Sequence, residues 1–281
     1  MNNYDLVVVC VIYDKELDES STIEALRRVD VGAMRLKLIV WNNGPFSIKY
    51  DKEIAGDLER RFFSVSLVNS PVNRSLSRIY NEVFDDFAGR AQAFCLLDDD
   101  TILPEHYFFK YESLRIISSG AVYFPAVFGG GRLVSPAARD GSRLDSFNPG
   151  VWPVWNFRAI ASGMVIPAST AKTVRFDERF DFYGADTDFV LELGRHGWNA
   201  VFMDVSLSHS ISTDVGPSIE FSDFKYRSLL QSFKLVGVKH GMRLNSLKKI
   251  LRLGLRQGVA SRRFAPIICA AGYALDLLRS R

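Results

Sequence analysis

Cysteine is scarce in this sequence, and its placement suggests neither disulfide bonds nor zinc binding. Three cysteines occur in 281 residues (Cys10, Cys95 and Cys269), each within an apolar stretch, and no CxxC pair or Cys/His cluster is present. A disulfide-stapled scaffold and a structural zinc site are therefore not expected. A reducing compartment is the expected location.

Long hydrophobic runs and phosphate-binding glycine motifs are also missing. The first apolar segment, Leu6–Ile12, is too short to span a membrane and follows a polar N-terminus without the basic residues of a signal peptide. No Walker A or GxGxxG motif occurs, so phosphate binding by a glycine-rich loop is not predicted. With 47% hydrophobic and 24% charged residues, the chain is predicted to be globular and cytoplasmic.

The two ends of the chain differ strongly in charge. Of 35 basic and 32 acidic residues, 13 basic and two acidic ones fall within 221–281, which leaves 22 basic and 30 acidic residues before that segment. Gly216 and Pro217 interrupt the chain near the transition. We therefore expect an acidic domain over residues 1–218 and a basic helical extension over residues 219–281.

Strand and helix patterns alternate along the first part of the sequence. Buried strands are predicted at Leu6–Ile12, Leu36–Trp41, Val65–Val68 and Ala93–Leu97, and helices at Ser20–Val29, Ile54–Phe62 and Ser75–Phe84. This alternation is typical of an α/β fold with a mainly parallel sheet between helices. Ligands bind such sheets at the carboxyl ends of the strands, which draws attention to the turn at Asn42 and to Asp98–Asp100.

Three consecutive carboxylates, Asp98–Asp100, follow a buried strand. Like charges this close repel, and a bound divalent cation would resolve the conflict. Hard oxygen ligands suit Mg²⁺ or Mn²⁺, which could then neutralise a diphosphate. The alternative is a solvated acidic turn that also caps the helix expected near Pro104, and spacing alone does not decide between the two.

Two further positions could carry chemistry. Asp186 lies at or just before the start of a helix predicted over Asp186–His196, where the helix dipole favours an ionised carboxylate that could act as a general base. The alternative is a capping role, and for Asp188 we prefer a charge in the first helical turn. His209 follows a strand predicted at Ala200–Val205 and would be functional only if Asp98–Asp100 lie nearby.

The order of several segments resembles a known family. LLDDDTILP, SGMVI, FDERFDFYGADTDFVLELGRHGW and SHS occur in the order found in inverting, GT-A-fold glycosyltransferases of family 2, especially the bacterial rhamnosyltransferase-like branch. The resemblance covers about residues 5–212. It implies a Rossmann-like sheet between helices, with a nucleotide-sugar-binding half over residues 1–100 and an acceptor-binding half over 101–218.

The resemblance also implies an activity. The chain would be a metal-dependent inverting glycosyltransferase that moves a sugar from dTDP-rhamnose or a UDP-sugar to a hydroxyl of a glycan or lipid-linked glycan. The setting would be the synthesis of a bacterial surface polysaccharide such as lipopolysaccharide. Mn²⁺ or Mg²⁺ would be the cofactor.

The same resemblance assigns roles to the candidate residues. Asp98 and Asp100 match the Asp-x-Asp motif, so that Asp98 would contact the ribose or the metal and Asp100 would bind the metal. Asp99 would contact the donor sugar, unless it points away from the strand end. His209 would complete the metal site, and Asp186 would be the base that deprotonates the acceptor.

Four residues in the first half are expected on the donor side of the site. Asn42 stands where the family usually has an aspartate that reads the nucleotide base. Asn73 and Asn81 match a pair of asparagines in the loop and helix beside the donor. Arg78, on the same helix, would approach the diphosphate, and its alternative is an ordinary exposed arginine.

Two positions depart from the family pattern. Ala185 stands where a glutamate usually precedes the base, which alters the surroundings expected for Asp186. Ser75 replaces a small glycine in the donor-side loop.

Two other function classes compete with glycosyl transfer. Nucleotidyl transfer on a related α/β scaffold is disfavoured because no glycine-rich basic loop follows the first strand. A non-catalytic module that binds an anionic membrane or nucleic acid through its basic tail would leave Asp98–Asp100, Asp186 and His209 without a role. We expect no nucleic-acid partner.

The basic extension is predicted to form helices over residues 219–238, 243–260 and 264–278. In the second, Leu244, Leu247, Leu251 and Leu255 share one face, flanked by basic residues. One interpretation is peripheral binding to the anionic inner face of the cell membrane. The other, given equal weight, is packing on the catalytic domain or on another subunit of a homo-oligomer.

Overall fold

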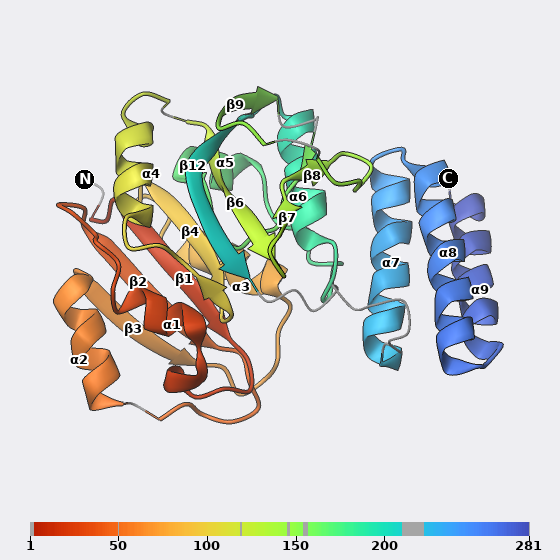
Figure 1. Cartoon of the computed structure of the whole chain (residues 1–281), viewed down its shortest axis with the longest axis horizontal. Helices are drawn as coiled ribbons and strands as arrows, with labels where there is room; N and C mark the ends of the chain where they lie inside the picture. Colours follow the sequence, from red (N-terminus) through yellow and green to blue (C-terminus); the bar gives the residue numbers. More distant parts are fainter. Residues whose placement is uncertain are drawn as a thin grey trace.

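The computed structural model describes residues 3–49, 51–118, 120–144, 147–153, 157–209 and 222–280. The chain forms an α/β domain followed by three long helices that stand side by side next to it (Figure 1). The predicted boundary between residues 218 and 219 lies outside the described residues.

The described strands of the α/β domain build a ten-stranded sheet. Its main path runs in the order β3 (Ser64–Asn69), β2 (Leu36–Asn42), β1 (Leu6–Ile12), β4 (Ala93–Asp98), β11 (Met164–Pro167), β6 (Val122–Gly129), β12 (Asn199–His209) and β5 (Thr101–Ile102). Strands β3, β2, β1 and β4 are parallel, and β11 is antiparallel to both of its neighbours. β7 (Arg132–Ser135) and β9 (Gly150–Pro153) pair with β6 and β12, while β8 (Ala137–Ala138) and β10 (Phe157–Arg158) form a separate pair.

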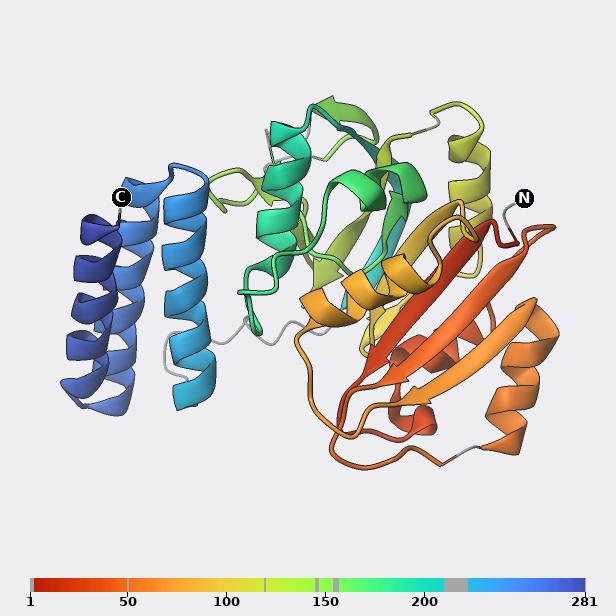
Figure 2. The ribbon, with the colours of Figure 1, turned by 180° about the vertical axis from the view of Figure 1, so that it is seen from behind.

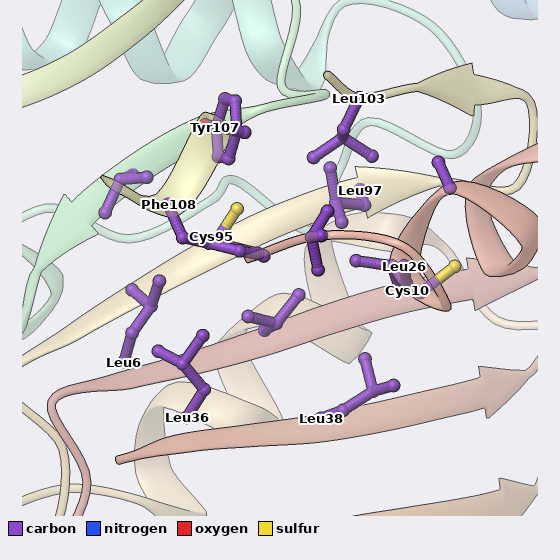
Figure 3. Packing of buried hydrophobic residues seen from close by; sticks show 14 of the residues in the cluster. Leu6, Cys10, Leu26, Leu36, Leu38, Cys95, Leu97, Leu103, Tyr107 and Phe108 are labelled. Carbon is purple, nitrogen blue, oxygen red and sulfur yellow. The ribbon is translucent and has the colours of Figure 1, made fainter. Parts of the chain in front are cut away.

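Helices cover both faces of the sheet, because its strands are apolar on both sides. The seven residues of β1 are all buried and contribute alternately to two hydrophobic clusters. On one face lie α1 (Ser21–Leu26), α2 (Lys52–Arg61) and α4 (Tyr107–Arg115), and on the other α3 (Leu76–Asp86), α5 (Ala168–Thr173) and α6 (Ala185–Arg195). Figure 3 shows the first cluster, where Leu6, Cys10 and Cys95 lie among packed aliphatic side chains below Tyr107 and Phe108.

The prediction of an α/β fold with a mainly parallel sheet and a helical extension is confirmed. One strand differs from expectation in a way that matters for the site. β12 continues four residues past the predicted end at Val205, because its last residues pair with β5, His209 opposite Thr101. The extra length carries His209 to the loop that follows Asp98.

The extension forms the three predicted helices, α7 (Asp223–Lys239), α8 (Arg243–Ser261) and α9 (Ala265–Arg279). Their small core contains Tyr226, Leu230, Ile250, Ala270, Ala274 and Leu277. α8 and α9 approach closely at Gly254, where an added Cβ would lie 2.4 Å from the Cβ of Ala270. Figures 1 and 2 both show α7 as the helix nearest to the α/β domain.

The leucine face predicted on α8 does not fill this core. Leu244, Leu251 and Leu255 are 75%, 44% and 56% exposed, whereas Leu247 packs partly against the bundle. Within the described part of the chain, no helix combines the length and the apolar character needed to cross a membrane.

Candidate functional site

The candidate residues of the first half gather at the carboxyl edge of the parallel strands. β1 lies between β2 and β4, with Ile12 opposite Asn42 on one side and Val11 opposite Asp98 on the other. The turn at Asn42 and the acidic loop after β4 therefore flank the same strand end.

The backbone of the acidic loop, Asp98–Asp100, is held by hydrogen bonds to hydroxyl groups that sequence reasoning missed. Thr22 Oγ1 donates to the carbonyl oxygen of Asp98 at 2.5 Å and accepts from the Thr101 amide at 2.8 Å. Ser162 Oγ accepts from the Asp98 amide at 3.1 Å. Because Thr22 and Ser162 lie about 60 to 80 residues away along the chain, no local sequence pattern predicts these hydrogen bonds.

Asp98, Asp100 and His209 form one cluster. A carboxylate oxygen of each aspartate and a ring nitrogen of the histidine all lie within 4.8 Å of one another. His209 Nδ1 is 3.0 Å from Asp100 Oδ1, and His209 Nε2 is 3.8 Å from Asp98 Oδ2. The three side chains are only partly exposed, at 32% for Asp98, 27% for Asp100 and 13% for His209.

Electrostatics in this cluster favour a cation. Removal from water raises the pKa of Asp98 to about 6; His209 opposes this, and Asp100, Asp186 and Asp99 add to it. Burial lowers the pKa of His209, but its hydrogen bond to Asp100 and the nearby carboxylates outweigh burial, so that the pKa is raised. A divalent cation would neutralise the same carboxylates, and this set of oxygen and imidazole donors fits Mn²⁺ or Mg²⁺.

The Asp99 side chain does not join this cluster and instead contacts the segment after β1. Its Oδ1 is 2.9 Å from Lys15 Nζ, and its Oδ2 accepts from the amide of Tyr13 at 3.2 Å. The side chain is 16% exposed. Asp99 thus fastens the segment after β1 to the acidic loop, and its contact with a donor sugar stays a prediction.

Asn42 is buried inside its own turn. It is 1% exposed, and its Nδ2 donates to the Phe46 carbonyl at 2.6 Å and to Asn69 Oδ1 at 2.7 Å. Its Oδ1 accepts from the Gly44 amide at 3.0 Å. The amide therefore shapes the loop at the end of β2, and base recognition by Asn42 stays a prediction.

Asn43 links this turn to the predicted Asn73. Asn43 Nδ2 donates to Asn73 Oδ1 at 2.9 Å and to the Arg74 carbonyl at 2.8 Å. Asn43 Oδ1 accepts from the Arg74 amide at 2.8 Å. Sequence reasoning missed Asn43, although it lies within the same turn signal as Asn42.

On α3, Asn81 and Arg78 face the segment that leads to α6. Asn81 is 8% exposed and exchanges two hydrogen bonds with the backbone of Phe176, at 2.9 and 3.1 Å. Arg78 is exposed, with its Nε 3.4 Å from Glu178 Oε2. Both line an open groove with Arg74 and Arg175. Through its hydrogen bonds to Phe176, Asn81 positions the segment that precedes α6 and Asp186.

Asp186 is the second residue of α6. The turn before it depends on Gly184, which has φ of +89° and whose added Cβ would lie 2.8 Å from Ser232 on α7. The Thr187 amide donates to Asp186 Oδ1 at 2.6 Å. Burial raises the pKa of Asp186, while this hydrogen bond and the charge of Arg158 oppose the rise. A carboxylate with a raised pKa is the stronger proton acceptor.

Asp186 and Tyr80 both lie close enough to Asp98 for their charges to interact. Asp186 contributes to the raised pKa of Asp98. Burial raises the pKa of the Tyr80 phenol, and Asp98 and Asp186 raise it further. Tyr80 is 1% exposed, and its hydroxyl has no hydrogen-bond partner within the described parts of the chain. Sequence reasoning missed this residue, because it reads as an ordinary core aromatic on α3.

Asp188 is in the first turn of α6, as expected, but it is also fully buried against the extension. Its carboxylate is 2.8 Å from Lys239 Nζ and 2.7 Å from His240 Nε2. Asp188, Glu192 and His240 have the spacing of a metal site. The ammonium of Lys239, 3.7 Å from Glu192, already supplies a cation there.

Comparisons with known proteins place the fold. Neither family models nor curated protein sequences give a match. Among solved structures, GalNAc-T7 with UDP, GalNAc and Mn²⁺ is similar, with a TM-score of 0.58 and 11% identity over 84% of this chain and 48% of that one. This chain thus spans about half the length of the GalNAc-T7 chain.

A second similar protein is TarS of S. aureus. Its 1–349 fragment with UDP has a TM-score of 0.58 and 12% identity over 98% of this chain and 89% of that one. The same fragment with UDP-GlcNAc gives a TM-score of 0.57 and 11% identity over the same shares. At these identities the comparisons establish the fold alone, and the α/β domain has the GT-A fold.

Proposed function

We propose that this chain is a metal-dependent, inverting glycosyltransferase that moves a sugar from a nucleotide-sugar donor to a hydroxyl of a glycan or lipid-linked glycan. The observation that carries the proposal is the cluster of Asp98, Asp100 and His209 at the strand edge, with Asp186 close enough for its charge to raise the pKa of Asp98. The GT-A proteins with UDP or UDP-GlcNAc named above support a nucleotide-sugar donor. A UDP-sugar or dTDP-rhamnose is the proposed donor, and a bacterial surface polysaccharide is the proposed destination.

Asp98, Asp100 and His209 would hold the metal. Mn²⁺ or Mg²⁺ bound there would stabilise the charge that develops on the departing diphosphate. Thr22 and Ser162 fix the backbone of the acidic loop, so that the carboxylates are oriented before a donor arrives. Preorganisation of this kind avoids a reorganisation cost during the reaction.

Asp186 would receive the proton of the acceptor hydroxyl. As the acceptor oxygen bonds to the anomeric carbon from the opposite face, the bond from that carbon to the diphosphate breaks and its electron pair leaves with the diphosphate. The configuration inverts, and no covalent enzyme intermediate is required. The raised pKa of Asp186 suits this role.

The donor side would be completed by the loops around Asn42 and Asn73 and by α3. Buried Asn42 and Asn43 give these loops a fixed shape. Arg78 and Asn81 line the groove beside α3. Asp99 would act on the donor by fixing the segment that contains Lys15, or by direct contact with the sugar.

One assay separates this proposal from nucleotidyl transfer. The full chain is incubated with Mn²⁺ and, in separate reactions, with a panel of nucleotide sugars or with a nucleoside triphosphate and a sugar phosphate, and the released phosphate species is identified. Sugar transfer or hydrolysis releases a nucleoside diphosphate, whereas nucleotidyl transfer with a sugar phosphate and a nucleoside triphosphate releases pyrophosphate. Release of pyrophosphate alone would contradict the proposal.

For the extension we propose peripheral contact with the anionic inner face of the cell membrane. Leu244, Leu251 and Leu255 are exposed on one side of α8, next to the exposed Lys248 and Arg252. Leucines can enter the headgroup region while the cations meet anionic lipid, at about 1 kcal/mol per cation. Full-length protein should co-sediment with anionic vesicles, and serine at the three leucine positions should abolish this. Loss of self-association instead would assign the same face to a homo-oligomer.

A further inference from the structure

The loop after β8 connects the α/β domain to the extension at a second place. Both overall views show this loop reaching towards the ends of α7 and α8 (Figures 1 and 2). Residues 139–142 form its described tip, and Gly141 has φ of +88°. With no side chain at Gly141, the space above its Cα is open to neighbouring groups.

Two cationic groups from distant segments converge on that space. A Cβ built on Gly141 would lie 3.0 Å from Lys249 Nζ and 3.8 Å from Arg158 Nη1. Lys249 belongs to α8, and Arg158 to the short strand β10. The extension and the acceptor half therefore each contribute one positive charge to the same spot.

No carboxylate of the described residues forms an ion pair with either cation. Asp140 is the acidic group whose charge raises the pKa of both cations. Its Oδ1, however, accepts hydrogen bonds from the amide and the hydroxyl of Ser142, at 2.8 and 2.7 Å. Burial, together with the charge of Arg158 and against the charge of Asp140, lowers the pKa of Lys249 to about 8. Partly buried cations that form no close ion pair are costly, and a bound anion would offset that cost.

Arg158 is fixed in position by its other nitrogens. Its Nε donates to the Arg139 carbonyl at 2.5 Å, and its Nη2 is 4.0 Å from Met242 Sδ. The preceding residue, Phe157, is fully buried in the domain core. Nη1 is thus left facing Gly141 beside Lys249.

These cations lie on the acceptor side of the site. The charge of Arg158 lowers the pKa of Asp186, the base of the proposed reaction. In the proposed reaction the diphosphate of the donor binds at the acidic loop, through a metal that Asp98 and Asp100 would hold. An anion at Arg158 and Lys249 would therefore be part of the other substrate.

We propose that Arg158 and Lys249 form a subsite for a phosphate group carried by the acceptor. A phosphate monoester has close to two negative charges at neutral pH and several acceptor oxygens, which match two adjacent cations. Its assignment to the acceptor rests on the proposed glycosyl transfer, whereas the anion site itself does not.

Methyl phosphate is the probe for this subsite. Calorimetric titration of the full chain, in a chelator and at constant ionic strength, should show binding. Lys249→Met and Arg158→Met should each weaken it at least tenfold. Lys248→Met removes the neighbouring exposed lysine and should leave the affinity unchanged, while Lys249→Arg should retain binding.

A second measurement needs no variant. Methyl phosphate should slow chemical modification of Lys249 in the wild-type chain, followed by mass spectrometry, and should not slow modification of Lys248 in the same peptide. Equal rates with and without the probe, or equal affinities in all variants, would overturn the subsite.

Two controls separate the possible sources of phosphate and the two proposals. Binding of phosphatidic acid vesicles that needs Arg158 and Lys249, without binding of methyl phosphate, would assign the site to a lipid headgroup and overturn the acceptor assignment. Mn²⁺-dependent nucleotide binding is measured in parallel. If nucleotide binds and methyl phosphate does not, the subsite fails alone; if the reverse holds, glycosyl transfer fails and the anion site stands.

Discussion

Asp188 Oδ2 lies 2.8 Å from Lys239 Nζ, and this ion pair joins the first turn of α6 to the last residue of α7. Asp188 is fully buried, and its other oxygen is 2.7 Å from His240. Asp186, the proposed base, lies two residues earlier on the same helix. The extension is therefore attached to the helix that carries the proposed base.

Removal of the buried Asp188 charge should destabilise the whole chain. In Asp188→Asn, Lys239 keeps Asp177 but loses its closest buried partner. Breaking a buried pair in this way costs about 3–5 kcal/mol. The loss is measured by urea unfolding, with Asp181→Asn as the matched exposed control. Equal unfolding free energies for the two variants would contradict the structural role of the pair.

The turn before the base should tolerate no side chain. Gly184 and Gly197 both have positive φ, at +89° and +73°, but only an added Cβ at Gly184 would meet other atoms, 2.8 Å from Ser232 and 3.1 Å from Phe180. Gly197→Ala should cost about 1–2 kcal/mol from backbone strain alone. Gly184→Ala should cost more and should also lower turnover. Equal losses of stability would show that contact with α7 is unimportant there.

Metal binding should weaken at acidic pH. The raised pKa of Asp98, about 6, means that Asp98 favours the fold when protonated, and that this contribution is lost as pH rises through 6. A metal requires the ionised form, so Mn²⁺ should raise the melting temperature clearly above pH 7 and little near pH 5. Asp98→Asn should remove the response at both pH values. A response equal at both pH values in the wild type would contradict the assignment of Asp98.

Asp186 should matter for the chemical step and not for donor binding. Asp186→Asn preserves size and can still accept the Thr187 hydrogen bond, but it cannot take a proton. We expect kcat to fall by about 10²-fold or more, with the Kd of the donor unchanged. Asp181→Asn again serves as the control. Near-normal kcat in Asp186→Asn would place the base elsewhere.

The fold was largely predictable because its signals are local. Apolar β-branched runs such as Leu6–Ile12 predict buried parallel strands, and the rule for strand ends then selects Asn42 and Asp98 without knowledge of any contact. His209 was different. Its approach to Asp100 depends on the pairing of β12 with β5, which joins residues about 100 positions apart, and only the family resemblance indicated it.

Contacts between segments that are distant along the chain could not be predicted from the sequence. Asp188 reads as a first-turn charge, because its partners Lys239 and His240 lie some 50 residues later. Lys249 reads as one of many basic residues on an amphipathic helix, and its approach to Arg158 depends on how α8 docks. Asn42 is predicted as a turn residue that reads the nucleotide base, and its burial follows from the closure of the loop around it.

We propose above all that Asp98, Asp100 and His209 bind a nucleotide diphosphate through a divalent cation. Calorimetric titration of UDP and dTDP, with and without Mn²⁺, tests it most directly in the wild type, Asp100→Asn and the exposed control Asp204→Asn. We predict Mn²⁺-dependent binding of at least one nucleotide to the wild type and the control, and its loss in Asp100→Asn. Nucleotide affinity that is the same in Asp100→Asn, or independent of Mn²⁺, would contradict nucleotide binding through a metal at this cluster.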